Sequence, residues 1–305
     1  MLALLSLATT GYRVAVFGGT GLVGSRCVKA LSDMDVEVVS VSRSGAPPEW
    51  ASGAAWTSSV RWVAADAEDA EAVAESLSGG VDCVVSCIGS AGRDLLAVSA
   101  DGWSGWGWTE MSKRAYAVNY EPNVNVVAAA KAAGAQRFVY VGASSDAEQG
   151  FAGPNPGLYT GKRAVALAAQ EAFGDSFTYF GPHQVVESAK DPRLKFAKSG
   201  IADGLRAFND VIGEIRSFGT DFTTKTRLAP PVVASTLALA MAASATGRVD
   251  VEPSMRSAGM TTFSETYERD QYEIQDLLCH VDGTEAITAL AERAEAAGLG
   301  APEEA

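Results

Sequence analysis

The sequence predicts an α/β protein with a doubly wound parallel sheet and a small C-terminal α-rich lobe. Three observations predict this fold class. Short apolar runs alternate with amphipathic segments along most of the chain, as strands and helices do in such sheets. The first apolar run leads directly into glycines spaced three residues apart, and a later run is almost wholly apolar, as in a strand covered on both faces. With 305 residues, of which 47% are hydrophobic, the chain is long enough to bury a large core.

The first expected strand, residues 13 to 17, runs into a glycine-rich turn and then a helix. In such a turn Gly18 permits a sharp bend, Gly21 lets the backbone approach a pyrophosphate, and Gly24 lets the helix pack close to the sheet. Backbone N–H groups at the start of that helix favour a phosphate. We therefore expect a dinucleotide cradle, the alternative being a merely structural turn. The expected cofactor contacts here are Gly18, Thr20, Gly21, Leu22, Val23 and Gly24.

The second expected strand, residues 36 to 41, ends in Ser42, Arg43 and Ser44. Proteins that bind NAD place an acidic residue about twenty residues after the glycines, where it holds the ribose 2′-hydroxyl. This chain offers a guanidinium and two hydroxyls instead, and a guanidinium matches phosphate geometry. The sequence thus predicts a preference for NADP(H), with NAD(H) possible. The alternative for Arg43 is a solvated loop arginine.

Later segments continue the alternation of strands and helices. The third strand, over residues 61 to 66, ends in Asp66, which we expect beside an adenine. The fourth, over residues 81 to 89, passes Cys87 and ends in Gly89, where it would face the cofactor. Further helices are expected over residues 70 to 77 and 123 to 133, and further strands over 137 to 142 and 177 to 180. Ligands should collect at the carboxyl ends of these strands.

These motifs resemble the atypical short-chain dehydrogenase/reductase family. The segments that carry the resemblance are residues 13 to 24, 39 to 45, 82 to 89, 119 to 134 with 137 to 141, and 162 to 163. Within the family the chain is most similar to a plastid and mitochondrial NAD(P)-binding group, which includes a coenzyme Q biosynthesis protein and, more distantly, the nucleotide-binding accessory subunit of respiratory complex I. The resemblance implies a Rossmann domain over residues 1 to 182, with cofactor contacts that include Asn119, Lys162 and Pro182, and an organellar location. Residues 183 to 305 would form a substrate-side or partner-binding lobe interleaved with that domain.

The resemblance also implies a Ser, a Tyr and a Lys that act together, with the Tyr four residues before the Lys. At that spacing both side chains share a helix face, so the ammonium can lower the pKa of the phenol that transfers the proton. Here Leu158 stands four residues before Lys162, and Tyr159 stands one place late. The candidate catalytic residues are Tyr159, Lys162 and Ser144.

The displaced tyrosine leaves several functions open. The chain could be an accessory, regulatory or assembly subunit that binds nucleotide with little turnover, or an NADPH-dependent reductase or isomerase acting on a carbonyl, enone or quinone-like substrate. A degenerate fold without nucleotide is the third option. After the sixth strand the family pattern has Arg-Pro-Gly, whereas this chain has Gly181, Pro182 and His183. His183 is a candidate acid or base, or a local hydrogen-bonding residue.

Residues 90 to 115 are expected to form a long loop that contains Trp103, Trp106 and Trp108. Long loops in compact domains tend to be functional, and tryptophan is enriched at interface hot spots. These side chains could cover the nicotinamide, anchor a partner protein, or shield an exposed end of the sheet.

Composition excludes several classes of function. A net charge of −13 argues against nucleic-acid binding. Four cysteines and two histidines show no spacing typical of a metal site, and Cys83 and Cys87 are expected to be core thiols. The longest apolar run, residues 232 to 245, is shorter than a transmembrane span and predicts a buried helix.

Overall fold

The computed structural model describes residues 11–89, 105–144, 147, 156–188, 190, 230–251, 277 and 279–300. Seven of their strands form one parallel sheet in the order β3-β2-β1-β4-β5-β6-β9. These strands are β1 (Arg13–Phe17), β2 (Glu37–Ser42), β3 (Arg61–Ala64), β4 (Cys83–Ser86), β5 (Arg137–Val141), β6 (Phe177–Gly181) and β9 (His280–Asp282). The predicted doubly wound α/β fold is confirmed.

The chain reverses its direction of winding at β1. This strand pairs in parallel with β2 on one side and with β4 on the other, so that Phe17 lies opposite both Val41 and Ser86. The chain runs outward from β1 through β2 to β3, then crosses back to β4 on the other side of β1 and continues toward the opposite edge of the sheet. A crevice opens at such a point outside the carboxyl ends of the strands, and there the ligand of a doubly wound fold binds.

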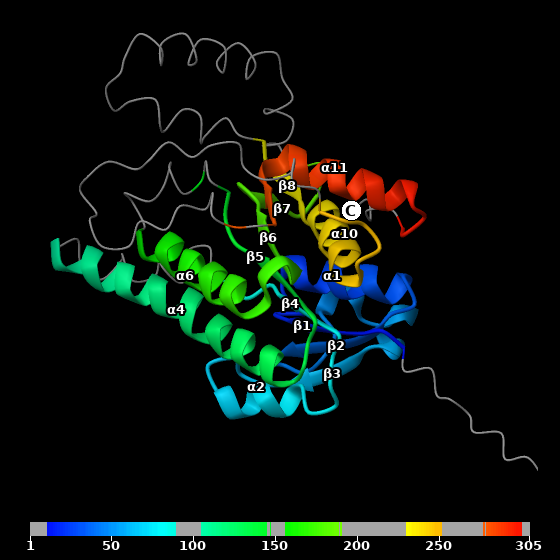
Figure 1. Ribbon diagram of the computed structural model, residues 1–305, viewed down its shortest axis with the longest axis horizontal. Coiled ribbons are helices and arrows are strands. Elements are labelled where there is room, and N and C mark those ends of the chain that lie inside the picture. Colours follow the sequence, from blue (N-terminus) through cyan, green and yellow to red (C-terminus); the bar gives the residue numbers. More distant parts are fainter. Residues whose placement is uncertain are drawn as a thin grey trace, which may run out of the picture.

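Helices cover both faces of the sheet (Figure 1). On one face α1 (Leu22–Asp33) packs against α10 (Ala234–Thr246), and α10 packs against α11 (Gly283–Ala296). On the other, α4 (Gly105–Ala132) packs against both α2 (Ala70–Ser76) and α6 (Pro156–Phe173). Each face therefore has its own apolar core. The short elements are the 3₁₀ helices η1 (Glu49–Ala51), η2 (Ala55–Ser59) and η3 (Gly174–Ser176), and the paired strands β7 (Val185–Val186) and β8 (Val232–Val233).

The apolar run at residues 232 to 245 forms the buried helix that its composition predicts. Nearly every residue of α10 is buried, and the helix ends at Gly247, whose φ of +65° closes it in the left-handed conformation. The helix begins two residues later than expected, because Val232 and Val233 pair with β7. None of the helices within the described residues is long and apolar enough to cross a membrane.

The predicted loop over residues 90 to 115 is wrong from Gly105 onward, because α4 begins there and not at residue 123. Trp106 and Trp108 lie in the first turns of this helix, whereas Trp103 lies outside the described residues. Pro122 sits inside the helix, where it removes a backbone hydrogen bond, and so the sequence favours a break there. Tertiary packing outweighs that preference. At Gly161 of α6 a Cβ would lie 2.9 Å from the carbonyl oxygen of Tyr116, so the two helices are in close contact before Pro122.

The strand β9 is not predicted from the sequence. Its three residues form no periodic pattern, yet they pair in parallel with β6, and His280 lies opposite Tyr179. The described part of residues 183 to 305 thus contributes a strand and two long helices to the main layers. The division of the chain after residue 182 stays a prediction.

The end of β5 is shaped by a glycine that a larger residue could not replace. A Cβ at Gly142 would overlap the ring carbon Cζ and the hydroxyl oxygen of Tyr179, a fully buried side chain. The Tyr179 hydroxyl donates to the carbonyl oxygen of Ala143 at 2.9 Å and accepts from the Ala143 N–H at 2.7 Å. This contact holds the backbone immediately before Ser144, at the carboxyl edge of the sheet.

We expect Gly142→Ala to lower the free energy of unfolding by about 1 to 3 kcal/mol, the usual cost of overpacking a core. Urea denaturation measures the change. Gly11→Ala is the control, since a Cβ there meets nothing within 4 Å. Equal stability of the two variants would contradict the close packing of Gly142 on Tyr179.

Candidate dinucleotide-binding site

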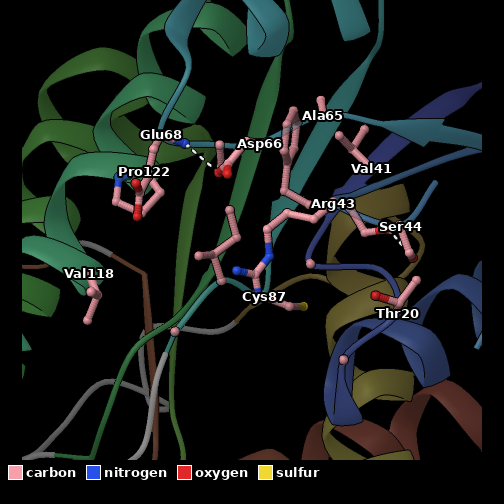
Figure 2. Close-up of a pocket in the computed structure, with 17 residues that line it drawn as sticks. Thr20, Val41, Arg43, Ser44, Ala65, Asp66, Glu68, Cys87, Val118 and Pro122 are labelled. Carbon is pink, nitrogen blue, oxygen red and sulfur yellow. Dashed lines mark hydrogen bonds between the residues drawn. The ribbon is translucent and has the colours of Figure 1, made fainter. Parts of the chain in front are cut away.

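An open pocket of about 500 Å³ lies at the carboxyl edge of the sheet, beside the reversal at β1 (Figure 2). Five segments far apart in the sequence line it. They contribute Gly18, Thr20 and Gly21 after β1, Ser42, Arg43 and Ser44 at the end of β2, residues 65 to 68 after β3, Cys87, Ile88 and Gly89 after β4, and Val118 and Pro122 from α4.

The glycine turn brings backbone close to backbone. Gly18 has a φ of +73°, and a Cβ on it would lie 3.1 Å from the carbonyl carbon and oxygen of Cys87. A Cβ on Gly24 would overlap the carbonyl oxygen of Gly18. The turn is held by hydrogen bonds from the Gly18 N–H to the carbonyl oxygen of Val41 and from the Gly21 N–H to that of Gly18, both at 2.9 Å. Only residues without a side chain permit this geometry.

The start of α1 suits an anion. Gly21 caps the helix without a side chain, and the first turn contains no acidic residue. Backbone N–H groups at this end therefore have no side-chain acceptor, and the helix dipole is positive there. Thr20 and Gly21 line the pocket at this point, while Leu22 is exposed and Val23 is half-buried against the core. A phosphate group fits this end of the pocket.

Arg43 extends into the pocket from the end of β2. In Figure 2 its guanidinium lies in the space between Asp66 and Cys87. The side chain forms no hydrogen bond or ion pair with any residue that the structure describes. Across from it, the carboxylate of Asp66 accepts from the backbone N–H of Glu68 at 3.1 Å. The pocket thus contains a cationic group that is available to a ligand.

Lys162 and Asn119 do not line the pocket but converge beside it, around Gly89, which does. A Cβ on Gly89 would lie 3.2 Å from Lys162 Nζ and 3.3 Å from Asn119 Oδ1. Lys162 Nζ also donates to the carbonyl oxygen of Val141 at 3.2 Å, and Asn119 Nδ2 donates to that of Ala115 at 2.8 Å. Residues from α4, α6 and the end of β4, far apart in the sequence, therefore meet at one place.

Asn123 is a residue of this site that the sequence analysis missed. Its Oδ1 accepts from Ser86 Oγ at 2.5 Å, and its Nδ2 donates to the carbonyl oxygens of Ile88 at 3.3 Å and of Asn119 at 2.8 Å. It therefore holds the segment after β4 against α4. Its spacing of four residues from Asn119, which places both on one helix face, was the available signal.

The structure brings Ser144 next to His183 and Pro182. Ser144 is buried, its Oγ lies 3.4 Å from His183 Nδ1, and its N–H donates to the carbonyl oxygen of Pro182 at 3.1 Å. Leu158 and Tyr159 are both half-buried on α6, with Leu158 four residues and Tyr159 three residues before Lys162. Ser145, the other serine of this segment, lies outside the described residues.

The pocket cysteine is a poor nucleophile. Burial raises the pKa of the Cys87 thiol to about 12, although the Lys162 ammonium opposes the shift. Burial also raises the pKa of Cys27 and of Cys83. Since thiols rather than thiolates prevail at neutral pH, these cysteines behave as apolar groups. Among the described residues there is no group of three His, Cys, Asp or Glu side chains that could hold a metal ion.

Comparisons with known proteins agree with this geometry. The sequence pattern of a family described as NAD(P)H-binding matches residues 18–178. An uncharacterized chloroplastic protein of Arabidopsis thaliana is 31% identical over 230 residues, which cover 75% of this chain and 70% of that protein.

Two solved structures resemble the chain in fold alone. The enzyme WbmH of Bordetella bronchiseptica, in complex with NAD+, is 19% identical with a TM-score of 0.44, and the match covers 63% of each chain, less than two thirds of that enzyme. A UDP-galactose 4-epimerase is 15% identical with a TM-score of 0.49, and the match covers 78% of this chain and 74% of the epimerase.

The family pattern covers more than half of the chain and begins at the glycine turn, on the wall of the pocket. The relative from Arabidopsis matches over most of its own length. The chain therefore belongs to the family of NAD(P)H-binding proteins with a Rossmann fold.

Proposed function

We propose that this protein binds NADP(H) in preference to NAD(H) and acts as an accessory or regulatory nucleotide-binding protein with little or no turnover of its own. The observation that carries this proposal is the guanidinium of Arg43, which lies in the pocket without a partner among the described residues. A ribose 2′-phosphate is the group that distinguishes the two dinucleotides, and a guanidinium binds it by charge-assisted hydrogen bonds.

The other residues of the pocket suit the remaining parts of the dinucleotide. The start of α1 and Gly21 would hold the pyrophosphate, and Asp66 would lie beside the adenine. Ser42 and Ser44 would add hydroxyl groups around the 2′-phosphate. Toward Gly89, the nicotinamide ribose would meet Lys162 and Asn119, with Pro182 near the nicotinamide. The bound cofactor would supply a hydride.

The low turnover in this proposal is argued from the residue that stands four positions before Lys162 on α6. Transfer of a hydride to a carbonyl needs a proton donor, and the family places a tyrosine four residues before the lysine for this purpose. Leu158 holds that position and has no proton to transfer. Tyr159 is turned away from it by about 100° around the helix axis, since an α-helix has 3.6 residues per turn.

A second function is favoured by the contact between Ser144 and His183. The two side chains are 3.4 Å apart at the carboxyl edge of the sheet, and an imidazole can exchange a proton near neutral pH. With Tyr159 or His183 as the acid and Lys162 at the ribose, the protein would be an NADPH-dependent reductase or isomerase that acts on a carbonyl, enone or quinone-like substrate.

An accessory role also implies a partner and a location. Trp106 and Trp108 at the start of α4, together with Trp103, are candidates to anchor a protein of a larger complex. The chloroplastic relative from Arabidopsis supports a plastid location, and a mitochondrial one is the alternative that the resemblance implies.

We expect Arg43→Ala to weaken NADPH binding by about 10- to 100-fold, because charged hydrogen bonds contribute about 1.5 to 3 kcal/mol each. NADH binding should change little. Isothermal titration with both dinucleotides measures the difference. The control is Arg61→Ala. Arg61 is the first residue of β3, at the end of the strand that faces away from the pocket. An unchanged preference in the Arg43 variant would refute the phosphate assignment.

We also expect NADPH bound to the wild-type protein to remain reduced when quinones, enones and aldehydes are added, because a proton donor is lacking at residue 158. Nicotinamide fluorescence follows the reaction. Oxidation by one class of compound, lost in Tyr159→Phe but kept in the control Tyr120→Phe on α4, would instead establish the reductase.

A further inference from the structure

We infer that Gly45 is a positioning residue for Arg43, and that the turn it closes sets the discrimination between a 2′-phosphate and a 2′-hydroxyl. The inference rests on the proposed binding of NADP(H). It adds a residue that lies outside the pocket lining and acts through the backbone.

Hydrogen bonds join the first and last residues of the turn after β2. Ser42 is its first residue and Gly45 its fourth, with Arg43 and Ser44 between them. The Gly45 N–H donates to both the carbonyl oxygen and the Oγ of Ser42, each at 3.3 Å. Ser42 Oγ also lies 3.2 Å from Ser44 Oγ, and Ser42 is buried. Arg43 and Ser44 are therefore held at the tip of a hydrogen-bonded turn.

The same turn is pressed against the neighbouring strand β3. Ser42 lies opposite Ala64 in the sheet, and its carbonyl oxygen also accepts from the Ala65 N–H at 3.0 Å. A Cβ on Gly45 would lie 2.6 Å from both the Cβ and the backbone nitrogen of Ala64. Such contacts are shorter than atoms tolerate, and the backbone of a paired strand cannot yield.

The conformation of Gly45 adds a second requirement. Its φ is +58°, in the left-handed region that residues with a side chain rarely adopt. Any other residue would thus both strain the turn and push it away from β3. Both effects would change the conformation of the turn from Ser42 to Gly45, which includes Arg43.

This anchoring matters because no described residue holds the Arg43 guanidinium by a polar contact. The side chain forms no hydrogen bond or ion pair with the described residues, so its direction is set by its own backbone. A small rotation at the Cα of a long side chain moves its far end by a much larger distance. Paired hydrogen bonds to a phosphate need the guanidinium to be held to within about 0.5 Å, so a shifted turn weakens them. The adenosine would contact other segments of the pocket, such as residues 65 to 68, and would be affected less.

The test compares adenosine 2′,5′-bisphosphate with adenosine 5′-monophosphate, two probes that differ only in the 2′-phosphate. Calorimetry gives the ratio of their dissociation constants. We expect Gly45→Ala to reduce this ratio about tenfold while monophosphate binding stays within about twofold of wild type. The matched control is Gly53→Ala. Gly53 has a φ of +79° but nothing within 4 Å of a Cβ, so it shares the strain without the contact and should keep the wild-type ratio.

The variants Arg43→Ala and Arg43→Ala/Gly45→Ala identify the route of the effect. If Gly45 acts through Arg43, the second substitution changes the ratio no further once Arg43 is gone. A wild-type protein that does not distinguish the two probes overturns the assignment of Arg43, and the inference with it. A ratio that collapses in Arg43→Ala but survives in Gly45→Ala overturns the role of Gly45 alone.

Ala64→Gly provides a test should Gly45→Ala fail to fold. It removes the methyl group against which the turn rests, while leaving Gly45 and Arg43 intact. We expect it to lower the ratio in the same direction by a smaller factor. An unchanged ratio in a folded Ala64→Gly protein contradicts the inference.

Discussion

The close approach of backbone to backbone at the carboxyl edge of the sheet is the constraint on which the rest of the site depends. Gly18 meets the backbone of Cys87, Gly24 meets Gly18, and Gly45 meets Ala64. The contacts of Gly18 and Gly45 join segments from neighbouring strands, whereas that of Gly24 seats α1 on the turn after β1. A side chain at any of these positions would separate the layers that form the pocket. The pocket therefore depends on glycine, which has no side chain, at these few positions. The parallel pairing of β1 with β2 and β4 brings the positions together.

Electrostatics at the pocket differs from that of the whole molecule. The chain has a net charge of −13, which repels a polyanion at long range. Attraction is supplied locally by the start of α1, by Arg43 and, near Gly89, by Lys162. Since exposed charges are screened beyond about 10 Å at moderate ionic strength, these near groups decide whether the ligand binds. Asp66 and Glu68 leave the wall of the pocket after β3 acidic.

Under the proposed function, turnover depends on which residue of α6 shares a helix face with Lys162. Lys162 lies beside Gly89, at the edge of the pocket, because α6 packs against α4 and the Lys162 ammonium donates to the carbonyl oxygen of Val141 at the end of β5. Leu158 occupies the position four residues before Lys162, where the proposal expects the proton-donating tyrosine of a reductase. The polar contact between Ser144 and His183 lies after the ends of β5 and β6. This arrangement is the basis for proposing that the protein holds a nucleotide with little turnover.

By itself, the sequence determined the glycine turn, the presence of an arginine directly after the second strand, and the positions of six of the parallel strands along the chain. These features depend on local backbone conformation and on side-chain periodicity, and both are determined by residues that are close together in the sequence. The tertiary structure alone decided that β9 joins the sheet beside β6, that α4 starts at Gly105 and continues through Pro122, and that Asn123 joins Ser86 to the segment after β4. It also decided that Gly45 must rest on Ala64. Each of these depends on contacts between segments that are far apart in the chain, and packing energy there outweighs the local preferences that a sequence pattern records.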